Sequence, residues 1–395
     1  MAEIYCGIDW GGYTHWLCAV DGQGRRIISR RFAHDRTGLE ELRAALAGLG
    51  AALPVAIERS EGLLVEQLQE LGYVVYPVNP RVAARAREAY RVAATKDDAF
   101  DAFVLADALR QQHAHWRPLP RPSAALAELR ALVRDRQRLV EHQARVEAQL
   151  RATLEAYHPA AIHLFSSLDR DISLAFIRQY PTPRQAARVG PQRMARFLTA
   201  NSYRGRQPAD RLLGQLRAHL LEATAGTTAG KRRMALALVE QLELLNRQLK
   251  EFEAAIAEVL QSHPDGALFL SFPGVGIILA ATLLAELGED RDRFPSPEVL
   301  LAEAGLAPVT RSSGRTTRVR FRYAANTSLR EAFCWWAFTS IRLSPWARAA
   351  YDGSKAKGHH HYRALRGLGA RWARVLWRCW RDGTHYDPGR HAAAA

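Results

Sequence analysis

The sequence predicts a mixed α/β domain at the N-terminus, followed by an all-helical middle region and a helical C-terminal domain. Residues 1–113 alternate short β-rich runs with helical patterns, whereas the rest of the chain is dominated by helical periodicity. A chain of 395 residues can hold two or three domains with substantial cores. We predict domains at 1–116, 117–263 and 264–395, with the first boundary in a Pro-rich break.

The N-terminal region reads as three strands followed by alternating helices and strands. A capping box formed by Thr37 and Glu40 is expected to open the first helix, which runs to about Leu49. The predicted elements are strands 3–10, 14–20 and 26–33, helix 37–49, strand 54–58, helix 62–71, strand 73–78 and a helix through 98–112. An antiparallel trio followed by alternating elements fits an RNase H-like fold.

Four carboxylates in this region are spaced like one metal site. Asp9 and Glu58 end apolar runs, and Asp98 and Asp101 stand three apart on one face of a predicted helix. Acids at the ends of buried strands are costly unless a cation compensates them. Mg²⁺, or Mn²⁺ in its place, suits such oxygen ligands, and two ions ~4 Å apart could cleave a phosphodiester. The plain alternative is a set of solvated or paired surface acids.

Two further acids, Asp97 and Asp107, stand near these four in the sequence. Asp97 is rotated away from the Asp98–Asp101 face, and Asp107 lies later on the helix, so both are predicted to lie outside the site.

Sugar kinases and actin-like ATPases open on a similar sheet with a phosphate loop, as in residues 7–14. That fold needs later glycine-rich nucleotide loops, which this sequence does not show.

The middle region carries two stretches of heptad periodicity. Leucine and other apolar residues recur every seven positions in 132–153 and again in 238–259. These stretches predict long helices packed as a coiled coil, within the chain or between chains, with an ordinary helical hairpin as the alternative. Residues 165–230 are predicted to be helical but irregular, with no assigned chemistry.

The C-terminal region is strongly basic. From residue 311 onward there are 17 Arg or Lys against 4 Asp or Glu, within a chain of formal charge +15, and this favours a polyanion partner. Gly274 and Gly276 resemble the turn of a helix-hairpin-helix, whose amides could approach a phosphate; a tight turn between packed helices is the alternative. Trp372, Trp377 and Trp380 are expected in the core.

Cysteine usage and hydropathy predict the compartment. The four cysteines show no CxxC pairing, the N-terminus lacks the layout of a signal peptide, and the longest apolar run, 275–285, is too short to span a bilayer. We therefore expect a cytoplasmic protein with no membrane partner.

The motifs together resemble those of the DEDD-type insertion-sequence transposases, a family that includes Piv-type DNA invertases and bridge-RNA-guided recombinases. Gly7-Ile8-Asp9, Ile57-Glu58 and the run 96–102 are similar to the RuvC-like catalytic domain of that family. Residues 273–276, 292–294, 304–308 and Ser313-Gly314 resemble its C-terminal transposase domain.

The resemblance implies further properties of this chain. It maps the metal acids to Asp9, Glu58, Asp98 and Asp101, and a serine nucleophile to Ser313, with Ser312 adjacent. It also implies donor and target DNA, a structured noncoding guide RNA, and a dimer or tetramer in which the two halves could meet across protomers. The basic residues expected to contact nucleic acid and stabilise phosphate charge near the serine are Arg311, Arg315, Arg318 and Arg320. A DNA invertase, a RuvC-like junction resolvase and an inactive nucleic-acid-binding remnant remain the alternatives.

Overall fold

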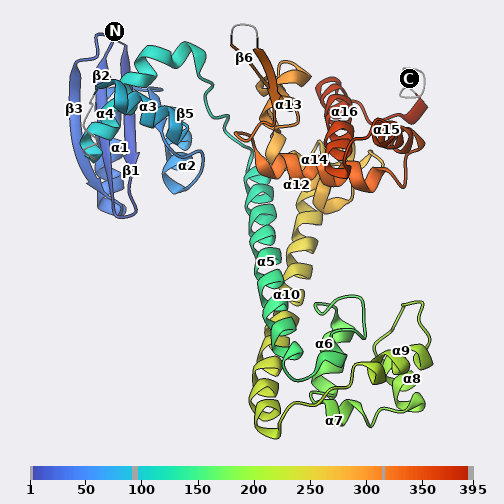
Figure 1. The fold of residues 1–395 in the computed structure, drawn as a ribbon. Helices are drawn as coiled ribbons and strands as arrows, with labels where there is room; N and C mark the ends of the chain where they lie inside the picture. Colours follow the sequence, from blue (N-terminus) through green and yellow to red (C-terminus); the bar gives the residue numbers. More distant parts are fainter. Residues whose placement is uncertain (1–2, 91–96, 314–315, 390–395) are drawn as a thin grey trace. The chain divides into compact units, whose positions relative to one another are not determined.

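The computed structural model describes residues 3–90, 97–313 and 316–389 and divides the chain into two compact units (Figure 1). The first unit is Met1–Arg121 and the second is Pro122–Ala395. The first unit therefore ends within the Pro-rich segment that the sequence marked as a boundary. The predicted boundary at residue 263 falls inside the second unit, between two of its helices.

The first unit is built on a five-stranded mixed sheet with the order β3-β2-β1-β4-β5. The first three strands pair antiparallel, whereas β1, β4 and β5 run parallel. The strands are β1 (Ile4–Trp10), β2 (Thr14–Asp21), β3 (Arg26–Ala33), β4 (Pro54–Ile57) and β5 (Val74–Pro77). This antiparallel trio followed by a parallel pair is consistent with the predicted RNase H-like class.

Helices cover both faces of this sheet. Alternation along β1 sends Cys6 and Ile8 to the face that packs with α1 (Arg36–Leu49) and α2 (Leu63–Glu70). The opposite face, which includes Tyr5, packs against α3 (Pro80–Tyr90) and α4 (Asp98–Gln112). The sheet thus has a core on each side, and α4 lies across the face that receives the odd-numbered residues of β1.

The start of α1 differs from the prediction. Asp35 caps the helix, since its side chain accepts a hydrogen bond from the Gly38 amide at 2.8 Å. The predicted capping box of Thr37 and Glu40 is wrong, because Thr37 already lies inside the first turn. An aspartate at the extended residue before the helix satisfies the same free amides.

The second unit contains two long helices that lie side by side and run in opposite directions (Figure 1). They are α5 (Ala124–Glu155) and α10 (Ala225–Ser262), and Arg136 on α5 reaches Glu253 on α10 at 2.5 Å. Leu242 and Ile256 of the second heptad stretch are buried. The two predicted long helices therefore exist, and they pair with each other as a hairpin within the chain; a coiled coil between chains is not confirmed.

The ends of this helix pair carry two separate cores. At one end, a helical lobe packs on α5 and α10; its helices are α6 (Asp171–Gln179), α7 (Pro183–Ala186), α8 (Pro191–Ala200) and α9 (Ala209–Ala218). At the other end the C-terminal helices pack around buried tryptophans. These helices are α11 (Gly266–Leu270), α12 (Ile277–Leu287), α13 (Pro297–Glu303), α14 (Thr327–Ser340), α15 (Pro345–Ala356) and α16 (His361–Asp382).

The tryptophans of α16 confirm the core prediction in large part. Trp372 and Trp380 are fully buried, and Trp377 is half-buried with its indole donating to the Phe294 carbonyl at 2.7 Å. Within the described ranges, no helix has both the length and the apolar character needed to cross a bilayer.

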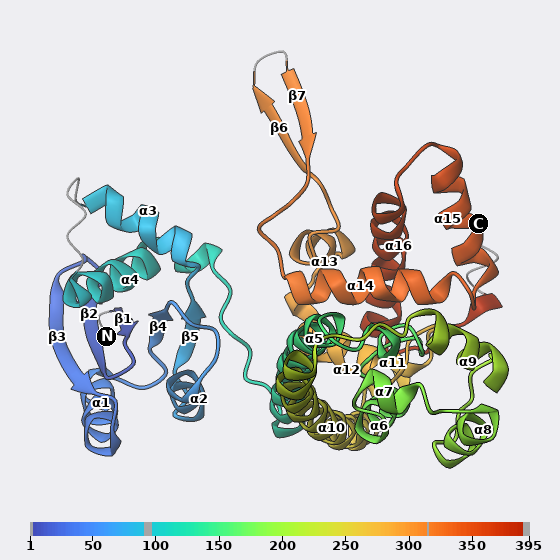
Figure 2. The ribbon, with the colours of Figure 1, turned by 60° about the horizontal axis from the view of Figure 1, so that its bottom comes forward.

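A β-hairpin interrupts the helical C-terminal domain and was not predicted. It consists of β6 (Val309–Ser313) and β7 (Thr316–Arg320), and it projects from the helices next to α13 (Figure 2). Every residue of β7 is exposed. A strand pair with no covered face has little apolar periodicity, which explains why the sequence pattern did not reveal it.

Candidate active site

Asp9 and Glu58 lie at the carboxyl ends of two neighbouring parallel strands, β1 and β4. Ile8 of β1 is paired with Ile57, the last residue of the parallel strand β4, and each of the two is followed directly by the acid. Ala56 belongs to the core under α4, and strand alternation places Glu58 on that same face of the sheet. Gly7 contacts α4, and alternation likewise assigns Asp9 to this face. The sequence thus placed two of the four acids correctly relative to the sheet.

The approach of α4 to this face depends on Gly7. A Cβ atom at this position would lie 2.2 Å from the Ala102 carbonyl oxygen and 2.4 Å from the Ala106 amide nitrogen. Both neighbours are backbone atoms of α4, so they cannot move aside independently of the helix. The glycine before Asp9 therefore allows the helix that carries Asp98 and Asp101 to lie directly on β1.

Asp101 is a buried carboxylate with one unsatisfied oxygen. Its side chain is 5% exposed, and its Oδ2 accepts from Nη1 of Arg87 at 2.8 Å. Its Oδ1 is buried and has no hydrogen-bond partner among the described residues. A buried ionised carboxylate normally uses both oxygens, so this one retains the capacity to bind a further cation or donor.

Arg87 links Asp101 to Glu58. The same guanidinium that bonds Asp101 places Nη2 at 3.8 Å from the Glu58 Oε1. Two acids separated by more than forty residues in sequence therefore share one cationic group at the edge of the sheet. The donor set fits a divalent cation, because it consists of carboxylates that already require positive charge nearby.

Asp97 is the residue that caps α4, and Asp98 is the first residue of that helix. The Asp97 carboxylate caps the helix by accepting from the Ala99 amide at 3.1 Å, which supports its exclusion from the site. Asp98 is exposed, three residues before the buried Asp101. Across the described ranges no three acidic, histidine or cysteine side chains form a group that could hold a metal. The predicted four-acid cage is therefore not closed here, although Glu58 and Asp101 share Arg87.

Asp107 has a different environment on the same helix. It is as buried as Asp101, but its Oδ1 accepts from Arg110 Nε and its Oδ2 accepts from Gln111 Nε2, each at 2.6 Å, and the Tyr90 hydroxyl also donates to it. Both of its oxygens therefore have partners within the protein. Asp107 therefore stabilises the packing of α3 and α4, as expected of an acid outside the site.

Sequence reasoning missed the basic and aromatic groups at this edge. Arg87 carries no signal of its own, since α3 contains several arginines at similar spacing. Beside the acids, the Arg59 guanidinium lies 4.8 Å from the Trp10 ring centre, and Tyr13 in the following turn is 91% exposed. Their adjacency to Asp9 and Glu58 in sequence was the available clue.

The second set of candidate residues lies on the β6–β7 hairpin. Ser313 is paired with Thr316, and Ser312 with Thr317. Residues directly opposite each other share a face, and faces alternate, so Ser313 shares its face with Arg318 and Arg320. Ser312 lies on the other face, with its hydroxyl 3.3 Å from that of Thr317. Gly314 and Arg315 lie outside the described residues, as does the side chain of Arg311.

Of the two glycines in the turn before α12, Gly274 is required for close packing. Gly274 has a φ of +81°, and a Cβ there would lie 2.9 Å from the Ser340 amide nitrogen. Its carbonyl accepts from the Thr339 hydroxyl at 2.9 Å, so the tight-turn alternative accounts for this residue. Gly276, exposed at the start of α12 with open space around it, stays a predicted phosphate contact.

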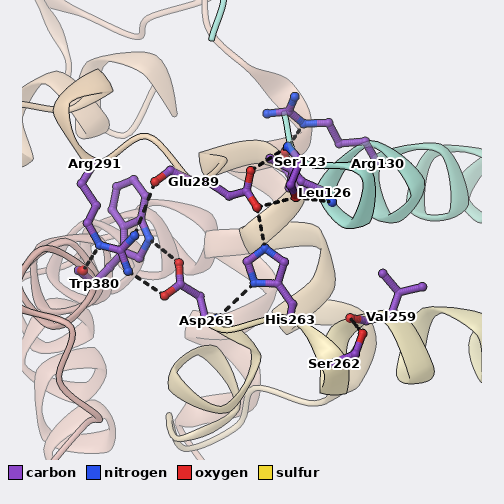
Figure 3. Close-up of polar contacts among 11 residues, drawn as sticks. Ser123, Leu126, Arg130, Val259, Ser262, His263, Asp265, Glu289, Arg291 and Trp380 are labelled. Carbon is purple, nitrogen blue, oxygen red and sulfur yellow. Dashed lines mark hydrogen bonds and ion pairs between the residues drawn. The ribbon is translucent and has the colours of Figure 1, made fainter. Parts of the chain in front are cut away.

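A polar cluster lies near the junction of α5, α10 and α12 (Figure 3). Glu289 accepts from the Ser123 hydroxyl at 2.6 Å and from His263 Nε2 at 3.0 Å. Asp265 bonds Arg291 at 2.6 Å and the Trp380 indole at 3.3 Å. Because these groups satisfy one another, the cluster joins helices rather than presenting a reactive group.

Comparison with known protein families and proteins identifies the family of this chain. A DEDD transposase profile of the IS110 type matches residues 6–159, and a profile described as transposase of the IS116/IS110/IS902 family matches residues 266–352. A protein of Streptomyces coelicolor named as a mini-circle transposase for IS117 is 35% identical over 98% of this chain and 96% of its own.

The chain belongs to the IS110-type DEDD transposase family. Transposases of this family cleave and rejoin DNA, so the chain is an enzyme of that class. The 42 kDa protein of insertion element IS900 from Mycobacterium paratuberculosis is 30% identical over the full length of both chains. The 43.6 kDa protein of insertion element IS110 from Streptomyces coelicolor is 28% identical over 97% of this chain and 95% of its own. The two profile matches cover the acids of the first unit and the serine hairpin of the second.

Proposed function

We propose that this IS110-type transposase mobilises an insertion sequence by Mg²⁺-dependent strand cleavage and rejoining, with Asp9, Glu58, Asp98 and Asp101 as the metal-binding acids. The observation that carries the proposal is the unsatisfied, buried Oδ1 of Asp101, a carboxylate that already shares Arg87 with Glu58. Bound Mg²⁺, or Mn²⁺, would polarise the scissile phosphate and favour the ionised form of the attacking hydroxyl.

The acids of this chain have distinct roles in the proposal. Asp101 is held in place by burial and by Arg87, so its free oxygen has a fixed direction. Asp9 lies within β1 and Glu58 directly follows the paired strand β4, so the sheet positions both. Asp98, exposed in the first turn of α4, completes the set from the helix end that favours negative charge but remains solvated without a ligand.

We further propose Ser313 as the nucleophile. Its Oγ would form a bond to phosphorus while the bond from phosphorus to the leaving strand oxygen breaks; the serine proton passes to solvent and the leaving oxygen gains one. The reverse reaction rejoins DNA with no external energy source. Arg318 and Arg320 share the ribbon face of Ser313 and could neutralise phosphate charge, which favours Ser313 over Ser312. Arg311 and Arg315 are proposed as further nucleic-acid contacts.

The proposed partners are donor and target DNA, a structured noncoding guide RNA, and further copies of this chain in a dimer or tetramer. The charge of the last part of the chain supports a nucleic-acid partner but does not distinguish RNA from DNA. Sequencing the nucleic acid that co-purifies with the protein tests the guide RNA. Mixing Asp101→Asn protein with Ser313→Ala protein tests cooperation between copies, since recovered strand exchange requires that two chains contribute to one reaction.

The serine and the acids are tested together by measuring divalent-dependent strand exchange and protein–DNA adducts. Asp9→Ala should abolish both, and Ser313→Ala should abolish the adduct, whereas Ser312→Ala is the matched control and should retain both. Cleavage that persists in Ser313→Ala without an adduct would indicate a junction-resolvase mechanism instead. Absence of any divalent-dependent cleavage in the wild type would indicate a binding remnant, and exchange confined to one fixed locus would indicate an invertase.

A further inference from the structure

The exposed aromatic side chains of the second unit are gathered on one surface. Tyr323 is 82% exposed, Tyr362 74%, Trp335 62% and Phe338 44%, and these are all the exposed aromatic residues found in the described part of that unit. Large rings are costly to leave in water, and scattered ones need no explanation, but a gathering of them marks a binding surface. These four residues, together with the partly buried Phe321, define the aromatic strip.

At both ends of this strip, neighbouring aromatic rings lie close to one another. Near the base of the hairpin, the rings of Phe321 and Tyr323 are 5.0 Å apart. On α14 the rings of Trp335 and Phe338 are 5.5 Å apart. The Phe338 ring lies 6.3 Å from His361, whose ring is 5.3 Å from Tyr362.

Arginines connect the two ends and supply positive charge. The guanidinium groups of Arg330 and Arg366 lie 4.8 Å and 5.1 Å from the Phe321 ring centre, from α14 and α16 respectively. Arg366 is one helical turn after Tyr362, so the helix itself joins the hairpin end of the strip to the α16 end. Glu331 is the single acid of α14, and the described part of α16 has none before Asp382.

Alternating rings and guanidinium groups are the features that bind an unpaired nucleic-acid strand. Each base presents a face that can stack on an aromatic ring, while arginine pairs with the phosphates between bases. A duplex covers the faces of its bases and offers only edges and phosphates. A protein partner would also fit exposed rings, but the shortage of acids favours a polyanion.

We propose that this strip binds single-stranded DNA next to the hairpin that carries Ser313. The choice of DNA rests on the proposed function, because strand exchange must release unpaired DNA strands close to the nucleophile. The binding itself depends on stacking and charge and needs neither the metal-binding acids nor catalysis.

The test measures binding without cleavage. Fluorescence anisotropy follows a labelled oligothymidylate of roughly 16 nucleotides, a length within the range one such groove covers, added to the full chain with the Asp101→Asn change in a chelating buffer. Trp335→Ala and Tyr362→Ala should each weaken binding about tenfold, the effect of losing one stacked base. Trp335→Phe should restore binding to within about threefold, since a ring remains. Leu244→Ala, which trims an exposed apolar side chain of α10, should match the parent.

Several results would overturn the proposal. They are unchanged affinity in both alanine variants, an equal loss for duplex DNA, and tighter binding of an RNA strand of matching sequence. A change in molecular mass of the two variants by light scattering would assign the strip to contacts between copies. Because the assay requires no metal and no strand cleavage, a failed nuclease proposal would leave its outcome unaffected.

Discussion

The two buried acids of α4 have the same exposure but opposite bonding. Asp101 and Asp107 are both 4% exposed, and each bonds an arginine. Asp107 accepts from three side chains, whereas Asp101 leaves Oδ1 without a partner among the described residues. Burial alone therefore does not distinguish a functional carboxylate from a structural one.

The difference has a thermodynamic meaning. A buried carboxylate whose oxygens are all bonded contributes to the stability of the fold, and removing it leaves its donors unpaired. A buried carboxylate with an open oxygen costs stability in the absence of a ligand. Such a cost is typical of sites that bind a cation.

The largest expected effect is on DNA cleavage by Asp101→Asn. The substitution removes the charge but keeps an oxygen that can accept from Arg87, so the unfolding free energy should change by less than about 1 kcal/mol. Strand cleavage in Mg²⁺ should fall by more than about 100-fold. Loss of a residue that only supports a metal ligand costs about 10-fold to 100-fold, and loss of the ligand itself should cost more. Cleavage assays and urea unfolding of the full chain measure the two quantities.

Asp107→Ala is the matched control and should show the reverse pattern. It removes the acceptor that Arg110, Gln111 and Tyr90 share, so the unfolding free energy should drop by about 1–3 kcal/mol. Cleavage per folded molecule should remain within about tenfold of the wild type. Tenfold is the smallest loss that is typical of disturbing a residue that supports a metal ligand. Equal loss of cleavage in both variants would contradict the distinction between the two acids.

The second expected effect concerns Gly7, which lets α4 and its acids approach β1. Gly7→Ala would place a methyl group against two backbone atoms of α4, so it should destabilise the fold by about 3 kcal/mol. It should also reduce cleavage in the molecules that remain folded, because it displaces Asp101. Thermal unfolding and cleavage assays report both effects. Gly12→Ala, for which the added atom meets nothing within 4 Å, should be nearly neutral. A fully stable Gly7→Ala protein would show that α4 does not require this approach.

The sequence predicted the sheet and the strand positions of Asp9 and Glu58 because both follow from local rules. Strand periodicity placed Asp9 and Glu58 at strand ends, and helical spacing put Asp98 and Asp101 on one face. These rules could not predict that Arg87 would bridge Glu58 and Asp101, since the contact depends on how α3 packs.

The hairpin and the capping residue show the same limit. β6 and β7 pair with each other and cover no core, so they lack the alternation by which a strand is recognised. The first helix begins two residues earlier than its capping-box pattern implied, because the cap is Asp35 and not Thr37. Local motifs therefore predicted the element types better than their ends or partners.

The third expected effect is a gain in metal affinity in Arg87→Gln. The guanidinium supplies the positive charge that Glu58 and Asp101 share, so it should compete with a cation for the same oxygens. Removing it should tighten Mn²⁺ binding by about threefold to tenfold, measured by titration with magnetic-resonance detection of free ion. Arg85→Gln removes an exposed charge from the same helix and should leave the affinity near that of the wild type. Weaker binding in Arg87→Gln would mean that the positioning of Asp101 by Arg87 outweighs its competition with the cation.

The smallest expected effect tests a fully bonded acid in the second unit, Glu289. Burial by itself would raise its pKa, but hydrogen bonds from Ser123 and His263 outweigh it and hold the pKa below the ordinary value of 4.5. His263 Nδ1 accepts from the Asp265 amide at 3.1 Å, so the ring proton is on Nε2 and points to Glu289 (Figure 3).

A carboxylate with a lowered pKa stabilises the fold above its unfolded value and loses that contribution as the pH falls through the folded value. The wild-type unfolding temperature should therefore fall more steeply below pH 4.5 than that of Glu289→Gln, which cannot titrate at this position. Glu258→Gln, a change on the exposed side of α10, controls for net charge. Parallel curves for wild type and Glu289→Gln would mean that this acid, despite its bonds, adds nothing to stability, and that satisfied oxygens are not what separates Asp107 from Asp101.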